Sequence, residues 1–239
     1  ESTYGDRVHD SEPPEERLAE IITEAAQNKS VVLVPAFSVG RTQLLLYYLA
    51  KLRRANRIPE MPVFLNSPMS ISATEIFRNF PSAHRLDAET CQQLRDAATY
   101  IRTPEESRRL NETAGPMVII SANGMASGGR ILHHLKAFAP HRRNTILLSG
   151  FQAGGTRGAS LAAGARSLRI HGEEVPVHCE VAQLACASAH ADAAEIEAWL
   201  RGAPRPPATT FITHGEPDAA DALRQQVERS LGWQTCLPD

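Results

Sequence analysis

Hydrophobic residues along the chain follow two spacings, and each spacing predicts a different element. Residues 15–28 place apolar side chains on one helical stripe, and prolines precede them, so the segment predicts an amphipathic helix. Residues 31–34 form an uninterrupted apolar run, which is typical of a strand buried on both faces of a sheet. A second helical stripe at residues 44–52 and a second apolar run at residues 62–65 follow, so the first third of the chain predicts repeated βα units.

The same alternation continues through the rest of the chain. Residues 67–109 are mostly helical with interrupting prolines, while segments 167–171 and 175–179 alternate in hydrophobicity and predict a hairpin joined by residues 172–174. The remaining expected elements are strands 117–121, 145–149 and 209–213 and helices 131–138, 193–201 and 219–231. Strands that alternate with helices predict an α/β fold with a mainly parallel sheet flanked by helices.

Composition places the chain among globular proteins and argues against a membrane partner and against a basic surface over the whole protein. The 239 residues are 42% hydrophobic and 22% charged, which is enough to bury a core as one large domain or two smaller ones. A formal charge of −2 excludes a global basic field, so a polyanion would have to bind at a local site. No apolar run approaches the roughly 18 residues of a membrane span, so we expect a cytoplasmic protein without a membrane partner.

The cysteines and the first residue narrow these expectations. Cys91, Cys179, Cys186 and Cys236 form no C-x-x-C pair, so neither a zinc ribbon nor a redox dithiol is predicted, and buried free thiols are expected. The sequence begins at Glu1 without a methionine, and we therefore expect it to be part of a longer protein.

Three loops share one arrangement, in which an apolar strand ends in small residues and an arginine precedes the next helix. The loops span residues 35–41, 121–130 and 149–158. In a parallel sheet such loops gather at the carboxyl edge, where helix N-termini offer free N–H groups and a partial positive charge. The residues predicted to bind phosphate there are Ser38, Gly40, Arg41, Gly124, Arg130, Gly155, Thr156 and Arg157.

The same loops have plainer interpretations. None matches the motifs for nucleoside triphosphates or dinucleotides. The glycines of any one loop are also explained by tight turns, and the arginines by capping of nearby carbonyls or pairing with surface carboxylates. The recurrence of the arrangement in three loops favours a phosphate ligand.

Two of the nine histidines occupy positions that suit chemistry. His190 precedes an expected helix, and His214 lies at the end of an expected strand. Neutral imidazole offers a lone pair near physiological pH, so a histidine at such a position can coordinate a metal or transfer a proton. Each is, taken alone, equally well explained as an ordinary hydrogen-bonded histidine. The residues interpreted as structural or surface histidines are His9, His84, His141, His171 and His178.

Short motifs in a fixed order carry a family resemblance over nearly the whole chain. They lie at residues 1–5, 35–41, 67–69, 121–130, 150–156, 188–192 and 213–216. Each motif alone is weak, but the ordered set resembles the β-CASP ribonucleases of the metallo-β-lactamase superfamily, in particular the cleavage-and-polyadenylation and Integrator endonucleases and their prokaryotic relatives. The resemblance implies a parallel β-CASP sheet at residues 6–187. Residues 1–5 would end an N-terminal metallo-β-lactamase segment, and residues 188–239 would form the C-terminal part of its αββα sandwich.

The resemblance also implies roles for individual residues. Glu1 and His190 match a catalytic pair in which the carboxylate orients the imidazole beside the scissile phosphate, and Ser188 matches a residue next to that phosphate. His214 matches a zinc ligand. The family's other ligands to two zinc ions belong to an H-x-H-x-D-H region and further residues that this sequence does not contain. We therefore expect that the chain alone does not retain zinc and is inactive.

The function expected from the resemblance is zinc-dependent hydrolysis of RNA phosphodiester bonds, with single-stranded RNA as the partner. Two alternatives stay open, a non-catalytic β-CASP scaffold subunit of an RNA-processing complex and a DNA-processing nuclease. Asn66 stands where an aspartate is common and Cys186 where an aromatic residue is usual, which bears on the substrate more than on the chemistry. A homodimer, the identity of the RNA and the choice between internal and terminal cleavage are also left open.

Overall fold

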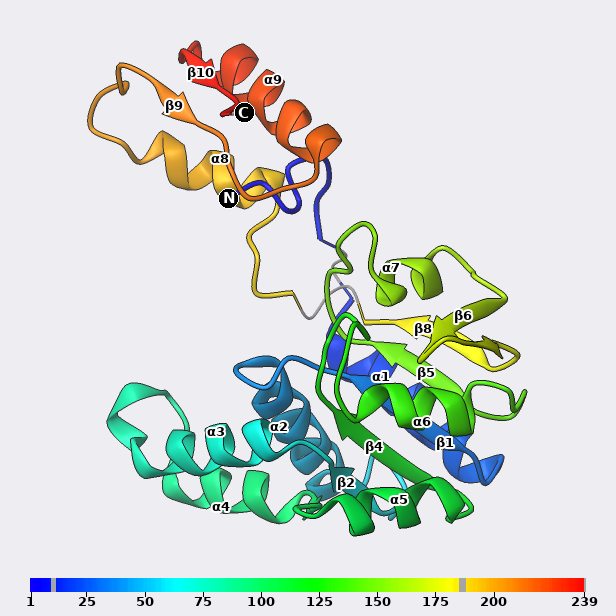
Figure 1. Cartoon of the computed structure of the whole chain (residues 1–239). Coiled ribbons are helices and arrows are strands. Elements are labelled where there is room, and N and C mark those ends of the chain that lie inside the picture. The colour runs from blue at the N-terminus through cyan, green and yellow to red at the C-terminus, as the bar shows by residue number, and fades with distance from the viewer. Residues whose placement is uncertain (10–11, 185–187, 239) are drawn as a thin grey trace. The chain divides into compact units, whose positions relative to one another are not determined.

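The computed structural model describes residues 1–9, 12–184 and 188–238, which form two compact units (Figure 1). Glu1–Ser11 and Ala185–Asp239 together make the terminal unit, and Glu12–Leu184 make the sheet unit. The β-CASP segment expected at residues 6–187 is therefore wider than the sheet unit. Residues 6–9 belong with the C-terminal part of the chain, because they bond to the start of its first helix.

A parallel sheet is the centre of the sheet unit. Its strand order is β3-β2-β4-β1-β5-β8, and every neighbouring pair runs parallel. The strands are β1 Val31–Pro35, β2 Val63–Leu65, β3 Thr99–Tyr100, β4 Met117–Ser121, β5 Thr145–Leu148 and β8 Glu180–Gln183. All residues of β1, β4 and β5 are buried, which explains the uninterrupted apolar runs. The predicted α/β class with a mainly parallel sheet is confirmed.

Helices cover both faces of this sheet (Figure 1). The connection from β1 through α2 to β2 runs along the sheet in one direction, and the connection from β4 through α6 to β5 runs in the other. Because such crossovers are right-handed, the two helices lie on opposite faces. The helices of this unit are α1 Pro14–Gln27, α2 Arg41–Arg54, α3 Pro68–Asn79, the 3-10 turn η1 Pro81–Ala83, α4 Ala88–Asp96, α5 Pro104–Glu112, α6 Ile131–Phe138 and α7 Arg157–Ala162.

The expected hairpin is present, with a different turn. β6 Ser167–Ile170 pairs antiparallel with β7 Glu173–Pro176. His171 and Gly172 form the turn with φ values of 51° and 84°, a geometry that suits a two-residue hairpin. The prediction that residues 172–174 join the strands was wrong, because Glu173 and Glu174 pair within the hairpin. Strand β8 was not predicted, because its polar ends enclose a very short apolar centre.

The terminal unit contains two helices and a small sheet. Its elements are α8 Ala193–Arg201, β9 Thr210–Phe211, α9 Pro217–Leu231 and β10 Thr235–Cys236. The two strands pair in parallel. Ile212, Leu223 and Val227 form a small core with the partly buried Trp233. The expected helix at residues 193–201 is confirmed, whereas the strand expected at 209–213 is shorter and the last helix begins earlier, at a proline that suits a first turn.

Two of the described cysteines are the buried free thiols that the sequence predicts. Cys91 and Cys179 are buried free thiols, and burial raises the pKa of Cys179 to about 11, so this thiol stays protonated at neutral pH. Cys236 is also free, and Cys186 lies outside the described residues. Within the described ranges, no helix has both the length and the apolar character that crossing a membrane requires.

Candidate active site

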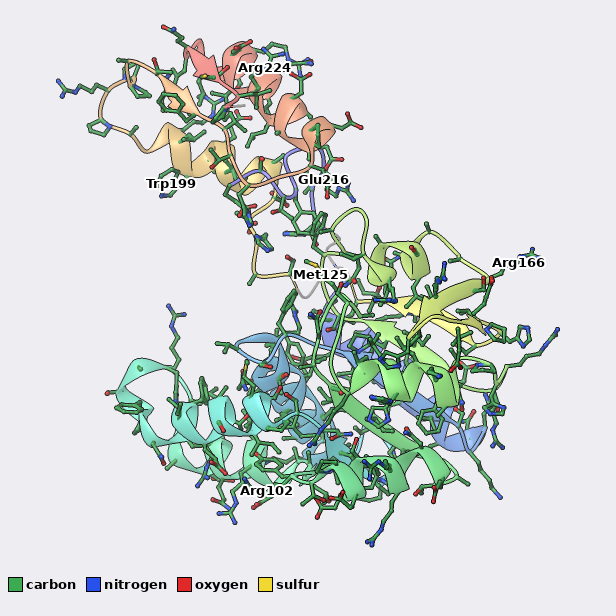
Figure 2. The ribbon with its side chains drawn as sticks, in the orientation of Figure 1. Arg102, Met125, Arg166, Trp199, Glu216 and Arg224 are labelled. Atoms are coloured by element: carbon green, nitrogen blue, oxygen red, sulfur yellow. The ribbon has the colours of Figure 1, made fainter. Side chains whose placement is uncertain are left out.

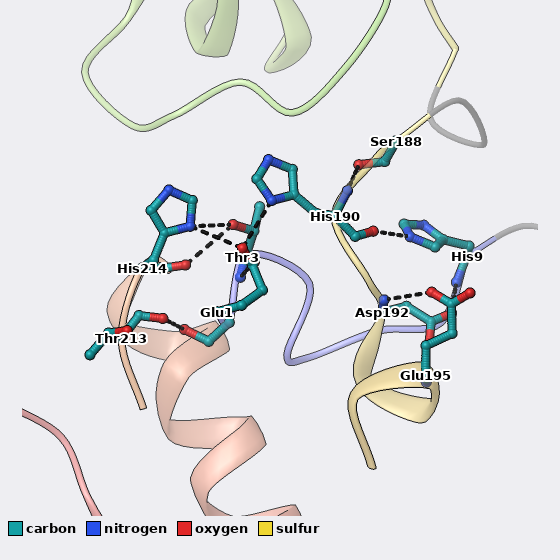
Figure 3. A network of polar contacts seen from close by, with 10 residues as sticks. Glu1, Thr3, His9, Ser188, His190, Asp192, Glu195, Thr213 and His214 are labelled. Carbon is teal, nitrogen blue, oxygen red and sulfur yellow. Dashed lines mark hydrogen bonds and ion pairs between the residues drawn. The ribbon is translucent and has the colours of Figure 1, made fainter. Parts of the chain in front are cut away.

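The carboxylate of Glu1 is the centre of a polar cluster in the terminal unit (Figure 3). Its Oε2 lies 3.0 Å from Nδ1 of His190 and 3.1 Å from Nδ1 of His214. Its Oε1 accepts a hydrogen bond of 2.7 Å from the backbone N–H of Thr3. One carboxylate therefore bonds two imidazole rings that lie 24 residues apart in the sequence (214 − 190).

Residues 1–5 reach this position because they lie against the start of α8 and the end of β9. Ser2 donates from its backbone N–H to the carbonyl of His214 at 3.1 Å, and from its hydroxyl to the carbonyl of Thr213 at 3.0 Å. Tyr4 forms a parallel bridge with Asp192. The approach needs a glycine at position 215, because a Cβ there would lie 2.7 Å from the carbonyl oxygen of Ser2.

His190 lies in the loop that leads into α8. Its backbone N–H donates to Ser188 Oγ at 3.1 Å, and Asp192, the N-cap of the helix, follows two residues later. Asp192 and Glu195 form a reciprocal capping box, in which each carboxylate accepts from the backbone N–H of the other. The capping box fixes where the helix starts and so limits the path of the loop before it.

The charge of Glu1 is set by its hydrogen bonds. Burial by itself raises the pKa of this carboxyl group, but bonds from Thr3 and from His190 outweigh burial and hold the pKa at about 2. Glu1 is therefore a carboxylate at any pH near neutrality. Both rings turn an Nδ1 edge toward this negative charge and the opposite edge away from it (Figure 3).

The two rings also face each other. Their centroids are 5.6 Å apart with an angle of 26° between the planes. Thr3 contributes to the position of His214, because its hydroxyl donates to the carbonyl of that residue at 3.3 Å and lies 3.4 Å from its Nδ1. Among the described residues, no hydrogen bond reaches Nε2 of His190 or of His214, so both atoms are available to a substrate or a metal.

The cluster has the donor groups of a partial metal site. One ligand atom from each of Glu1, His190 and His214 can be chosen so that all lie within 4.8 Å of one another. A metal-ligating histidine usually binds through one ring nitrogen while the other donates to a carboxylate, and His214 has this arrangement. A tetrahedral zinc site takes at least three protein ligands. His214 therefore fits one zinc ligand, while the carboxylate of Glu1 is already used in holding both rings.

A second group of potential ligands, His9, Asp192 and Glu195, has a structural explanation. Asp192 accepts from the backbone N–H of Glu195 through one oxygen and from the backbone N–H of His9 through the other. Glu195 accepts from the backbone N–H of Asp192. These bonds cap α8 and tie residue 9 to it, so the group needs no metal to explain its proximity.

The three predicted phosphate loops do come together in the sheet unit. They follow β4, β1 and β5, which are neighbours in the parallel sheet, so the loops share its carboxyl edge. Two hydrogen bonds join the second loop to the third. The side-chain amide of Gln152 donates to the carbonyl of Gly124, and the backbone N–H of Gly158 donates to the carbonyl of Met125 (Met125 is labelled in Figure 2). Phe37 packs on Gly124, where a Cβ would lie 2.9 Å from its ring.

The first and third loops place their small residues at helix starts. Gly40, with φ of 79°, immediately precedes α2, and Arg41 is the first residue of that helix. Ser38 is buried, and its hydroxyl accepts from the hydroxyl of Ser70. Gly155 has φ of 76°, and Thr156 caps α7 by accepting from the N–H of Ala159. These residues have the structural roles that tight strand-to-helix turns require.

Arg130 and Arg157 both bond to backbone carbonyls. Arg130 donates to the carbonyls of Ile101 and Arg102 at 3.2 and 3.0 Å, and to Oδ1 of Asn66 at 2.8 Å (Arg102 is labelled in Figure 2). Arg157 donates to the carbonyl of Arg169 at 2.7 Å, with a longer bond of 3.4 Å to the loop. The carbonyl-capping alternative thus describes both side chains in this structure, and their binding of phosphate stays a prediction.

A cavity of about 750 Å³ opens at this carboxyl edge. Its lining includes Phe37, Ser38, Met69, Asn123 and Arg130. Phe37 and Met69 are exposed and give this cavity apolar walls. A concave site with apolar walls and a few polar groups is typical of a ligand-binding pocket.

Sequence reasoning found Glu1, His190, Ser188 and His214, and the structure brings all four into the terminal unit. It missed Thr3, whose contact with Glu1 leaves no mark in the sequence. It also missed the second bond of Glu1, to His214. The capping box could have been recognised from the Asp-x-x-Glu spacing ahead of an apolar helix.

Two family models match the chain. A model described as the Beta-Casp domain matches residues 42–161, about half of the chain, and a model described as the Zn-dependent metallo-hydrolase RNA specificity domain matches residues 174–238. The first match lies within the sheet unit. The second begins in its hairpin and includes the positions of both candidate histidines.

Curated relatives match almost the whole chain. Ribonuclease TTHA0252 of Thermus thermophilus is 36% identical over 93% of this chain and 52% of its own length. Transcription termination factor FttA of Pyrococcus abyssi is 30% identical, with 100% of this chain and 39% of that protein covered. The RNase J-like protein of Methanocaldococcus jannaschii is 27% identical, with 100% of this chain and 56% of that protein covered. The chain spans about half the length of the curated relatives it matches, and on these matches it belongs to the β-CASP family of the metallo-β-lactamase superfamily.

Proposed function

We propose that this chain forms part of a zinc-dependent nuclease that hydrolyses RNA phosphodiester bonds. The observation that carries the proposal is the pair of hydrogen bonds from Nδ1 of His190 and Nδ1 of His214 to one oxygen of Glu1. This arrangement leaves both Nε2 atoms free to act on a substrate or a metal. The names of the matched RNA specificity domain and of the ribonuclease relatives support RNA as the substrate.

His214 is the residue that would hold zinc. Its Nδ1 is bonded to Glu1, so Nε2 presents a lone pair, and its side chain is well exposed. The remaining protein ligands would come from parts of the longer protein that this sequence does not include. Zinc, when bound, would supply an activated water and stabilise the negative charge on the phosphate oxygens.

His190 would transfer the proton to the leaving oxygen. Glu1 holds its ring through Nδ1 and balances the positive charge of the protonated ring, while Nε2 points away from the carboxylate. Ser188 lies beside it, bonded to the backbone N–H of His190, and would be close to the same phosphate. Glu1 thus acts through the two histidines and need not touch the substrate.

The sheet unit would bind the RNA strand. The loops after β1, β4 and β5 combine helix N-termini with Arg41, Arg130 and Arg157, and the cavity beside them has an exposed aromatic wall. Single-stranded nucleic acids are bound by such combinations of positive groups and aromatic surfaces. The net charge of −2 requires that this binding be local.

Two variants of the full-length protein test the assignment of the histidines. His190→Ala should abolish most RNA cleavage and leave the zinc content nearly unchanged, because this residue acts on the substrate. His214→Ala should lower both cleavage and zinc content, because this residue is a ligand. Zinc is measured by elemental analysis and cleavage on a labelled single-stranded RNA, with a DNA strand of the same sequence as the comparison.

The exposed His141→Gln variant serves as the control, since this residue belongs to the sheet unit and the cluster belongs to the terminal unit. Equal loss of zinc from the two alanine variants would show that the roles of His190 and His214 are wrongly assigned. Faster cleavage of the DNA strand than of the RNA strand would show that DNA, and not RNA, is the substrate class.

A further inference from the structure

His9 contacts the chain segment that carries His190 through both its ring and its backbone (Figure 3). Its Nε2 lies 2.8 Å from the backbone carbonyl oxygen of His190. Its backbone N–H donates to Oδ2 of Asp192 at 2.8 Å. The ring of Tyr4 meets the ring of His9 edge-on, with centroids 4.9 Å apart and 67° between the planes.

His9 is the donor in the hydrogen bond between its ring and the backbone of His190. A carbonyl oxygen only accepts hydrogen bonds, so Nε2 of His9 carries the hydrogen and donates it to His190. The edge-on packing of Tyr4 limits rotation of the donor ring. His9 is therefore a donor held in place from two sides, and it brackets the peptide that follows His190.

Three residues each hold a different part of His190. Glu1 bonds its ring, Ser188 bonds its backbone N–H, and His9 bonds its carbonyl oxygen. Without the third bond, the peptide after His190 gains freedom to rotate, and the rotation moves the ring against Glu1. A misplacement of about 1 Å at a reacting group can reduce the rate by roughly 100-fold.

A metal site does not explain the position of His9. The carboxylate oxygens of Asp192 already accept two backbone N–H groups, and Glu195 accepts the backbone N–H of Asp192. Nε2 of His9 donates to a carbonyl, so a metal could bind this ring only through Nδ1, beside carboxylates that are already hydrogen-bonded.

We infer that His9 is a positioning residue for His190, because its Nε2–H donates to the carbonyl of that residue while its backbone is tied to the start of α8. This inference rests on the proposed role of His190 in proton transfer. A glutamine can replace the donor, because its amide nitrogen extends about as far from the backbone as Nε2 of histidine. An asparagine is too short to reach the carbonyl.

The first measurement compares His9→Gln, His9→Asn and His9→Ala in the full-length protein. We expect His9→Ala and His9→Asn to lower kcat for RNA cleavage by roughly 10- to 100-fold, with KM within about 2-fold and zinc content unchanged. His9→Gln should retain most of kcat. His171→Ala, which changes an exposed histidine of the hairpin turn in the sheet unit, is the matched control.

The second measurement needs no activity and uses the 239-residue chain. The Nδ1 proton of His190, bonded to Glu1, should give a slowly exchanging imidazole resonance in NMR spectra of the parent chain and of His9→Gln. The resonance should broaden or disappear in His9→Ala. Absence of RNA cleavage by the full-length protein without substitutions would reject the proposed function. The NMR result on the 239-residue chain would still decide whether His9 holds the ring of His190 in position.

Two results would overturn the inference. One is an unchanged kcat and an unchanged His190 resonance in the folded His9→Ala variant. The other is a folded His9→Gln variant as impaired as His9→Asn, because donor capacity would then not be the relevant property. Where His9→Ala does not fold, the comparison of Gln with Asn still decides between these outcomes.

Discussion

Acid should destabilise the sheet unit through His134, a histidine of α6 whose side chain is fully buried with an exposure of 0%. Its Nε2 accepts from the amide of Asn66 at 2.6 Å, and its Nδ1 donates to Oδ1 of Asn111 at 2.6 Å. The amide of Asn66 also donates to Ser107, and its Oδ1 accepts from Arg130. A proton on Nε2 would face the Asn66 amide donor and would break this bond.

The size of the effect follows from the pKa. Burial lowers the pKa of His134 from 6.5 to about 4, and repulsion from His133 and Arg130 adds to the effect. At about 1.4 kcal/mol per pH unit, the difference corresponds to roughly 3 kcal/mol of unfolding free energy. Between these two pH values the unfolded chain binds a proton that the folded chain does not. Stability is therefore complete above pH 6.5 and is lost as the pH falls toward 4.

Urea unfolding at several pH values between 7.5 and 4.5 measures the effect in the parent chain and in His134→Leu. Two probes distinguish the units. Tryptophan fluorescence reports on the terminal unit, because both tryptophans, Trp199 and Trp233, lie there. Far-ultraviolet circular dichroism reports mainly on the sheet unit, because most helices lie in it. His141→Gln, at an exposed site, controls for general histidine titration.

We expect His134→Leu to be less stable at pH 7.5 by about 1–3 kcal/mol, because Asn111 loses its partner. The difference from the parent should shrink as the pH falls, since the leucine variant has no proton to gain at this position. Parallel pH dependences for the parent and His134→Leu, with His141→Gln unchanged, would refute the assignment of the buried proton equilibrium to His134.

Further predictions concern activity, RNA binding and the approach of residue 2. The purified 239-residue chain should not cleave RNA, since it offers one expected zinc ligand, and robust cleavage that EDTA inhibits would contradict this. In the full-length protein, alanine at Arg41, Arg130 or Arg157 should weaken binding of all single-stranded RNA sequences alike and make the salt dependence shallower by about one charge. Titrations at several salt concentrations measure this slope, and an unchanged slope in all three variants would leave carbonyl capping as their role. Gly215→Ala should destabilise the terminal unit by about 1–3 kcal/mol in fluorescence-monitored unfolding, because the new Cβ would lie 2.7 Å from the carbonyl oxygen of Ser2. An unchanged midpoint would show that the segment can shift without cost.

Long apolar patterns predicted the fold well, and short polar elements were missed. The runs that became β1 and β4 are buried along their whole length, so hydrophobicity alone indicates a central strand. β3 and β8 lie at the edges of the sheet, where burial is partial and the apolar pattern is too short to recognise. Their positions depend on pairing with distant strands rather than on local sequence.

The candidate site was predictable where a motif names a residue, and unpredictable where a contact joins distant segments. Glu1, His190 and His214 came from motif order. The bond of His9 to the carbonyl of His190 spans 181 positions and involves a backbone atom, which has no residue-specific pattern. The sequence therefore predicts no role for His9 beyond a structural or surface one, whereas its ring contacts the backbone of His190.

The sharing of one carboxylate oxygen by two imidazoles constrains the chemistry of both. Oε2 of Glu1 can only accept, because the pKa of this group is about 2, so Nδ1 of each ring must be its donor. The same tautomeric preference then leaves Nε2 of both rings on the edge away from Glu1, where the proposed function requires a lone pair on His214 and a transferable proton on His190. Glu1→Gln would keep the size of the side chain but present an amide in place of a charge. It should therefore impair proton transfer and metal retention together, whereas His190→Ala should leave the zinc content nearly unchanged. Equal RNA cleavage and zinc content in Glu1→Gln and the parent protein would show that the shared carboxylate does not link the two rings in function.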